Sequence, residues 1–363
     1  MIETRNGLST EYISHPGDTL LELLEQYGIS QKELSLKTQV SEKHINEIIK
    51  GKKSITISFA KKLENIFKPN ASFWMNRQSI YDEKIESLRI IENITEEEKS
   101  LINRFPINEL VKYGYIEDSR NEVENVLSLR KFTSSSSLLE TPNLLQYMIS
   151  GTSFKTDATT TNSDPYKLYS WLRICQIESE SIYNPNTFDF KALRASLVSI
   201  KQLSLLNDFN EVYKKLINIL YQCGINFRIV KNFQGLNVQG YIRTIQNSVS
   251  LCVTIKWHRE DVFWFTLFHE FGHLFYKRNN RAFIDMKDDE ETEANNFAKD
   301  HLIDSSTYET LKRNVNEKTI MQCAKSNGIS PAIVVGRLAN DKIIPQNRYK
   351  YLIRKIVWSD NNV

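Results

Sequence analysis

The amino-acid sequence predicts a mainly helical α+β protein, with an all-helical N-terminal domain, a helical middle region and a C-terminal domain that contains a small antiparallel sheet. Three observations predict this class. Apolar residues recur at spacings of three and four along most of the chain, which is typical of amphipathic helices. Between residues 225 and 255, β-branched residues occur in partly alternating runs, as in strands. The length of 363 residues exceeds one ordinary core and favours two or three domains.

The composition is that of a folded globular protein, with 40% hydrophobic and 25% charged residues. No stretch approaches the roughly 20 consecutive apolar residues that span a bilayer, and the first residues lack the basic-then-apolar pattern of a secretory signal. We therefore expect a cytoplasmic protein with no membrane partner. The four cysteines form no CxxC pair, which argues against disulfides and thiolate metal sites and favours buried thiols.

Four short helices are expected near the N-terminus. Their sequences are DTLLELLEQYG, SQKELSLKTQ, SEKHINEIIKG and TISFAKKLENIFK, and each begins with an Asp, Ser or Thr that suits an N-cap. Gly28 and Gly51 are expected to end two of them, because glycine adopts the left-handed conformation at little cost. A fifth helix is expected at about residues 70–89.

The rest of the chain divides by its periodicity. Residues 95–222 are expected to be mostly helical, with polar surface loops at 133–137 and 156–164. Three antiparallel strands are expected within 225–230, 237–245 and 248–255, followed by an apolar helix at about 261–277. We therefore expect an N-terminal domain at 1–90, a helical connecting region at 91–204, a C-terminal domain at 205–345 and a tail at 346–363.

The apolar helix carries the motif HEFGH at residues 269–273. Residues four apart lie on one face of a helix, so the imidazoles of His269 and His273 can bind a single metal ion. Glu270 lies about 100° further round the helix, beside the metal-bound water, where it is not used as a ligand. Gly272 costs about 1 kcal/mol inside a helix and indicates that another backbone approaches closely. The alternative is that both histidines only form hydrogen bonds in a core.

A third metal ligand is expected from the segment DDEETEANNFAKDHLI. Glu291 shares one stripe of this predicted helix with Ala294 and Ala298, so it would point toward the first helix. Glu291 is the first choice, and Glu290 and Glu293 are alternates on other faces. A catalytic zinc ion has three protein ligands and an open position, whereas a structural one normally has four. Three ligands therefore favour a catalytic zinc ion over a structural one.

The run WFTLFHEFGHLFYKR, followed by FID and by EETEANNFAKDHLID, resembles the ImmA/IrrE family of metallo-endopeptidases. The resemblance covers roughly residues 205–345. It implies a zincin-like domain in which His269, His273 and Glu291 hold one zinc ion and Glu270 is the general base. The sequence departs from the family at His301-Leu302-Ile303-Asp304, where Leu-Leu-x-Pro is common.

A peptidase mechanism would follow from these residues. Glu270 would take a proton from the attacking water and pass it to the leaving amine. The group that stabilises the oxyanion is not assigned, and Tyr276, His258 and Arg243 are the candidates. One of the strands between residues 237 and 255 is expected to align the substrate as an edge strand.

Positive charge is concentrated near the N-terminus. The net charge is only +3, yet residues 30–62 hold eight lysines against three glutamates. The second and third predicted helices have the lengths of a helix-turn-helix, whose second helix enters the major groove. The residues expected to face base edges are Ser41, Glu42, Lys43, His44 and Asn46, and those expected to meet phosphates are Gln31, Lys50, Lys52 and Lys53. The alternative is a four-helix module that does not contact DNA.

Residues 15–82, from HPGD to SIYD, resemble HigA-type antitoxins of the Xre family. The match includes His15-Pro16-Gly17 and Phe73-Trp74. It implies binding to a double-stranded DNA operator. Gln39 occupies the turn where glycine is usual, and Ser35 replaces the usual alanine.

Two functions are compatible with this sequence. The first is a DNA-binding transcriptional regulator with a zinc-dependent endopeptidase domain, which cleaves a partner protein such as a repressor. The second is a HigA-like antitoxin or autorepressor, in which the peptidase-like domain senses or binds a toxin partner without proteolysis. Either protein is expected to be a homodimer.

Overall fold

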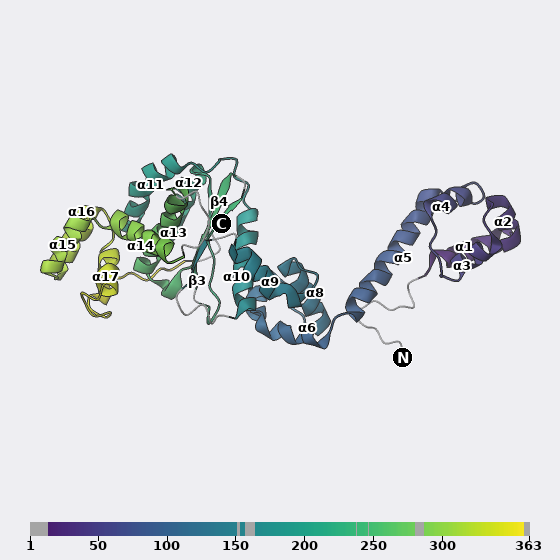
Figure 1. Cartoon of the computed structure of the whole chain (residues 1–363), viewed down its shortest axis with the longest axis horizontal. Helices are drawn as coiled ribbons and strands as arrows, with labels where there is room; N and C mark the ends of the chain where they lie inside the picture. The colour runs from purple at the N-terminus through teal and green to yellow at the C-terminus, as the bar shows by residue number, and fades with distance from the viewer. Residues whose placement is uncertain are drawn as a thin grey trace. The chain divides into compact units, whose positions relative to one another are not determined.

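A computed structural model describes residues 14–150, 153–156, 164–236, 238–245, 247–279 and 287–358. These residues are mainly helical and include a small mixed sheet, so the α+β class is confirmed. The chain forms two compact units (Figure 1). One comprises residues 1–100 and 119–127, and the other comprises residues 101–118 and 128–363.

The helices of the first unit match the expected ones closely. They are α1 (Pro16–Tyr27), α2 (Gln31–Thr38), α3 (Glu42–Ile49), α4 (Ile57–Glu64), α5 (Ala71–Glu92) and α6 (Glu96–Ser100). Twelve apolar residues from α1 to α5 and the turns between them form a buried core. Its largest member is Trp74, which has no exposed surface.

Local capping explains where these helices begin and end. Ser30, Ser41 and Thr56 are N-caps, as expected. The first helix differs, because it begins at Pro16 and His15 is its N-cap, while Asp18 completes the capping box. Gly28 ends α1 with φ 64°, so this expectation is confirmed.

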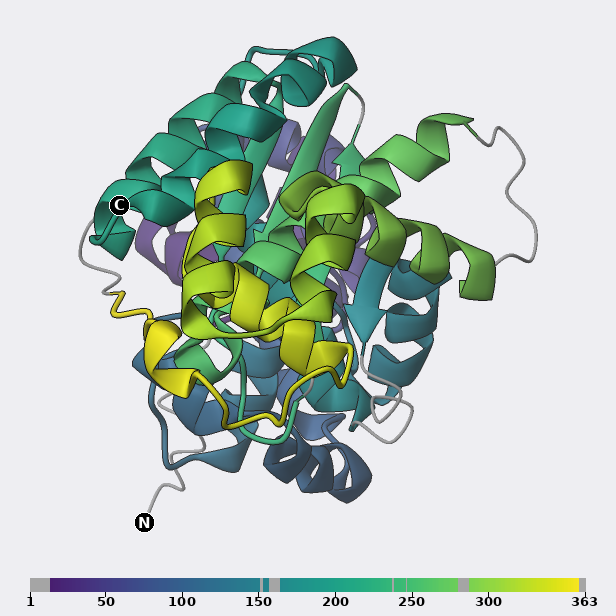
Figure 2. The ribbon, with the colours of Figure 1, turned by 90° about the vertical axis from the view of Figure 1, so that its left-hand side faces the viewer.

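The second unit holds the remaining elements, with α8 passing between the two units. The helices are α7 (Ile107–Lys112), α8 (Glu122–Thr133), α9 (Thr141–Ser150), α10 (Pro165–Glu180), α11 (Phe190–Gln202), α12 (Phe209–Gln222), α13 (Glu260–Asn279), α14 (Lys287–Leu302), α15 (Ser305–Arg313), α16 (Glu317–Asn327) and α17 (Pro331–Asn340). The strands are β1 (Ser153–Thr156), β2 (Ile225–Ile229), β3 (Val238–Ile245) and β4 (Ser248–Val253). Figure 2 shows this sheet with helices packed around it.

The sheet corrects the expected antiparallel arrangement. Its order is β1-β3-β4-β2. β3 runs opposite to β2, and β4 runs opposite to β3, but β2 pairs with β4 and not with β3, so the β2–β4 pair is parallel. β1 is a fourth strand that the sequence pattern did not reveal, and it covers β3 from residue 238 to 242. β3 and β4 are therefore interior strands over this length. Substrate alignment by one of them would require an edge strand, so this expectation is wrong.

The two faces of the sheet carry different helices. Leu251 and Val253 of β4 join the core formed with α12 and α13. Cys252, between them, points the opposite way and lies against α10, where its Sγ is 3.7 Å from the Cys175 carbonyl oxygen. The helix with the HEFGH motif therefore lies directly on one face of the sheet.

The second unit extends beyond the boundaries expected from the sequence. Residue 204 falls inside it, because α10 and α11 pack with the sheet and its helices. The segment expected as a tail is also part of this fold as far as residue 358. The Ile356 N–H donates to the His258 carbonyl at 2.8 Å, and the Arg354 guanidinium binds the Glu260 carboxylate at 2.7 Å.

Candidate metal centre and DNA-binding surface

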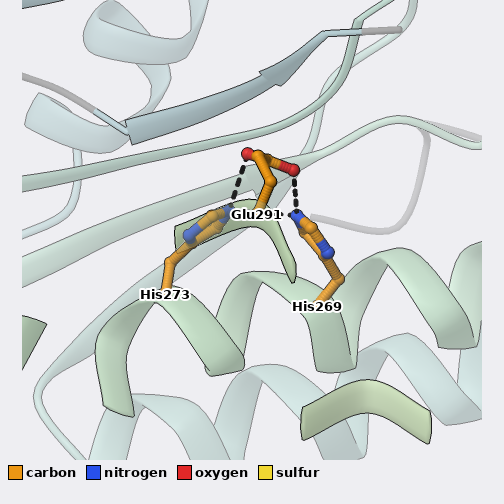
Figure 3. A group of neighbouring side chains, drawn as sticks. All are labelled: His269, His273 and Glu291. Carbon is orange, nitrogen blue, oxygen red and sulfur yellow. Dashed lines mark hydrogen bonds and ion pairs between the residues drawn. The ribbon is translucent and has the colours of Figure 1, made fainter. Parts of the chain in front are cut away.

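Three predicted ligands meet between α13 and α14. His269 and His273 project from successive turns of α13, and Glu291 projects toward both from α14 (Figure 3). The two Nε2 atoms are 3.0 Å apart. The Glu291 carboxylate places one oxygen 3.4 Å from each Nε2 atom. Both histidines are buried and Glu291 is half-buried.

These spacings fit a tetrahedral zinc ion. A zinc ion with bonds of about 2.0–2.1 Å requires neighbouring ligand atoms to be roughly 3.3 Å apart. The observed separations of 3.0 and 3.4 Å bracket this value. Two imidazoles and one carboxylate would be three protein ligands, which is the number found in catalytic zinc sites.

Asn295 orients one of the ligands. Its Oδ1 is 3.0 Å from Nδ1 of His269. Because an amide oxygen can only accept, the proton of the imidazole is on Nδ1, and Nε2 keeps the lone pair that a metal needs. Sequence reasoning missed this residue. The available signal was its position four residues after Glu291, on the same face of α14.

Glu270 lies between α13 and the sheet. It has no exposed surface. On its side of the sheet is Gly240 of β3, and a Cβ atom there would come within 2.8 Å of the Glu270 Cγ and would also collide with the carboxylate. Glycine at this strand position therefore leaves the space that the carboxylate occupies, which is a second feature that sequence reasoning missed.

The close helix contact expected from Gly272 is confirmed. A Cβ atom on Gly272 would lie 2.7 Å from Cα of Ala294 and 2.9 Å from its carbonyl oxygen. The backbones of α13 and α14 therefore touch one turn from the ligands. This contact fixes how near Glu291 comes to the histidines.

Burial removes the residues of this motif from water. His269, Glu270 and His273 are all at most 1% exposed within a single helix. Removing charged and polar groups from water is unfavourable unless partners replace the lost hydration. A cation between His269, His273 and Glu291 would provide such a partner.

The remaining candidates from the sequence are placed elsewhere. Glu293 is exposed on α14, and the side chains of Glu290 and Tyr276 lie outside the described residues. His258 is exposed before the start of α13. Arg243 alternates with Tyr241 and Cys252 toward the α10 face, opposite to Gly240, so it cannot stabilise an oxyanion at this site.

The first unit contains the predicted helix-turn-helix, formed by α2 and α3. The turn between them places Gln39 in the left-handed region with φ 55°, where glycine would be unstrained. α3 begins at the Ser41 cap, whose Oγ accepts from the His44 N–H at 3.3 Å. Its buried side is formed by Ile45 and Ile48.

The residues predicted to contact DNA lie on or beside this motif. Six of them are exposed, namely Ser41, Glu42, Lys43, Lys50, Lys52 and Lys53. The other three, Gln31, His44 and Asn46, are half-buried. The Asn46 amide donates to Oε1 of Gln31 at 3.1 Å, which joins the beginning of α2 to α3. Lys53 pairs with Glu47 at 2.9 Å and holds the pKa of that carboxyl below its ordinary value.

Within the described residues, no helix has the length and apolar character needed to cross a membrane.

Comparison with known proteins matches the N-terminal part of the chain. Residues 20–68 match the family model described as helix-turn-helix. A relative from Dichelobacter nodosus, named virulence-associated protein I, is 38% identical over 72 residues, which are 20% of this chain and 67% of that protein. The family model covers ten of the twelve core residues of the first unit and the motif formed by α2 and α3.

Proposed function

We propose that this chain, which through its N-terminal domain belongs to the helix-turn-helix family of DNA-binding transcriptional regulators, is also a zinc-dependent endopeptidase that cleaves a partner protein. The observation that carries this proposal is the group of His269, His273 and Glu291, whose ligand atoms have the spacing of a three-ligand zinc site. The proposed substrate is a partner protein such as a repressor.

The residues around this group suit peptide hydrolysis. Zinc held here would polarise a substrate carbonyl and lower the pKa of a bound water to about 7. Glu270 follows the first ligand in the chain, and Gly240 of β3 leaves the room that its carboxylate occupies. In this role the carboxylate would take a proton from the attacking water and return it to the leaving amine.

Metal binding is the first test. Purified protein should contain one zinc ion per chain, and His269→Ala and Glu291→Ala should each lose most of it. Glu293→Ala is the matched control, because it removes an exposed carboxylate from the same helix and should leave the metal content unchanged. Equal zinc content in all four proteins would refute the ligand assignment.

Proteolysis is the second test. Proteins encoded beside the gene are incubated with the wild type and with Glu270→Gln, which should retain zinc. Loss of the general base should slow cleavage by about 10²–10⁴-fold. Equal cleavage by both proteins would exclude this role for Glu270. Zinc binding and DNA binding without cleavage would instead support an autorepressor or antitoxin that uses the domain for sensing.

The DNA contacts require a separate test. We propose that α3 enters the major groove of an operator and that the protein binds as a homodimer, as related motifs do on paired half-sites. Lys52→Ala should weaken binding to the protein's own promoter and reduce its salt dependence, since it removes a charge near phosphate. Lys43→Ala should weaken binding because it removes a contact to a base edge. Lys61→Ala is the control, because Lys61 lies on α4 and pairs with Glu64. Unchanged binding in the first two variants would refute these contacts.

A further inference from the structure

A cavity of about 510 Å³ lies in the second unit, beside the candidate metal centre. Its lining comes mainly from α13, α14 and α17, together with the segment before α13. The floor is apolar and includes Val262, Phe265, Ala298, Leu302 and Ile333. Cavities of roughly 300–1,000 Å³ are typical of ligand sites. This volume exceeds that of any single amino-acid side chain.

The cavity and the metal centre share their supporting elements. On α13, Phe265 and Thr266 line the cavity, and His269 follows them by four and three residues, which is one helical turn of about 5.4 Å. The Phe265 and His269 rings are in contact, with centroids 6.4 Å apart. A molecule in the cavity would therefore lie against the helical turn that precedes His269, the first proposed metal ligand.

The same relation holds on α14 and β3. Asn295, which orients His269, is followed three residues later by Ala298 and seven residues later by Leu302, so all three lie on one face of α14. Gln239 of β3 also lines the cavity and accepts a hydrogen bond from Thr266 at 3.2 Å. The next residue, Gly240, is the one that faces Glu270. The cavity and the proposed active site therefore occupy neighbouring positions along α13, α14 and β3.

Charge around the cavity favours an acidic occupant. Three cationic side chains line it, Arg259, Lys299 and Arg337, against one carboxylate, Asp261, among the described residues. Arg259 is matched by Asp261 at 2.6 Å. Arg337 pairs with Asp341 at 2.9 Å, so Lys299 is the lining cation for which the described residues show no ion pair.

Arg337 is held rigidly at this position. Its Nε donates to Asp341 at 2.9 Å, its Nη1 donates to the Lys299 carbonyl at 3.2 Å, and its guanidinium lies 4.4 Å from the centroid of the Tyr308 ring. Arg337 therefore balances the charge of Asp341 and anchors the backbone of Lys299. This leaves the Lys299 ammonium as the lining charge that can meet an acidic group.

An exposed tryptophan lies at the edge of the cavity. Trp257 is 66% exposed. Its φ is 57° and that of His258 is 53°, so two consecutive residues other than glycine have left-handed backbones. Such conformations occur where surrounding structure imposes them, often at binding sites. Here they present a large aromatic ring beside an apolar cavity.

We propose that this cavity is the substrate-recognition pocket of the peptidase and binds a segment with a bulky apolar side chain followed by an acidic one. The apolar side chain packs on the floor formed by Val262 and Leu302. The acidic side chain meets Lys299. This inference rests on the proposed peptidase function, because it assigns the cavity to the substrate of the same site.

The test measures peptide binding without cleavage. The full-length Glu270→Gln protein, loaded with zinc, is titrated with three eight-residue peptides that contain Phe-Glu, Ala-Glu or Phe-Lys at the same two positions and are otherwise identical. Tryptophan fluorescence reports binding, and Trp257→Phe should abolish the change in signal. The Phe-Glu peptide should bind at least about ten-fold more tightly than either of the others.

Variants of the cavity locate the binding site. Lys299→Glu should reduce the preference for Phe-Glu over Phe-Lys by about ten-fold or more. Val262→Phe should fill the floor and weaken Phe-Glu binding by a similar factor. Val198→Phe is the matched control, because Val198 is exposed on α11 and should have no effect. Equal affinity for the three peptides, or affinities that neither cavity variant changes, would overturn the proposal.

Failure of the peptidase itself would give a different result. If the wild-type protein cleaves neither the peptides nor any partner, while the Glu270→Gln protein still shows the expected peptide preferences, the catalytic role fails and the recognition pocket stands. If the wild-type protein cleaves a partner but the peptide preferences are absent, the peptidase stands and the pocket assignment fails.

Discussion

Replacing Gly272 by alanine should weaken zinc binding through the spacing of two helices. The new Cβ would lie 2.7 Å from Cα of Ala294. Non-bonded carbon atoms prefer about 3.5–4.0 Å, so α14 must move by about 1 Å. Overpacking of this kind costs about 1–3 kcal/mol, and the better helix propensity of alanine returns about 1 kcal/mol. The expected loss of stability is therefore at most about 2 kcal/mol.

The effect on zinc should be larger than the effect on folding. Metal–ligand distances tolerate only about 0.2 Å of error, and α14 carries both Glu291 and Asn295. A shift of about 1 Å should lower zinc affinity by about 10–100-fold, the loss typical when a residue that supports a ligand is removed.

Competition with a chromophoric chelator would measure this affinity, and thermal unfolding would measure stability. Asn296→Ala, exposed on the same helix, is the control and should bind zinc normally. If Gly272→Ala bound zinc as tightly as the wild type, the contact between the two backbones would not set the geometry of the site.

Three other substitutions test separate parts of the structure. Gly240→Ala pushes the Glu270 carboxylate aside, so cleavage should fall by about 10²-fold while zinc content is unchanged; normal cleavage would contradict the assigned position of the base. Burial lowers the pKa of His15 below its ordinary value, and the neutral Nδ1 accepts a hydrogen bond from the Gly17 N–H at 2.8 Å. The stability that the neutral ring contributes is therefore complete above about pH 6.5 and is lost as the pH falls through the lowered pKa. Urea unfolding should therefore show a smaller acid-induced loss for His15→Asn, which caps without titrating, and equal losses would refute this reasoning. Arg354→Ala leaves the buried Glu260 carboxylate without its cation and should cost about 2–4 kcal/mol in the same unfolding assay, and unchanged stability would refute the importance of this ion pair.

The sequence by itself determined the features that depend on neighbours along the chain. The caps at Ser30, Ser41 and Thr56 each bond to a backbone N–H within three residues, so a local pattern is sufficient to predict them. The positions of His269 and His273 on one helix face follow from their spacing alone. Gly272 indicated a close contact because glycine is costly in a helix, although the sequence did not identify the residue it meets.

Tertiary structure decided everything that depends on which distant segments meet. After β2 the chain leaves one strand position empty and forms β3, and β4 then fills that position and pairs with both strands. β1 joins the sheet from a region without strand periodicity. The same long-range packing brings Asn295 to His269 and Gly240 to Glu270. It also creates the cavity, whose lining residues are scattered between positions 239 and 346. Spacing along the chain carries no information about such contacts, since they depend on the packing of whole helices and strands.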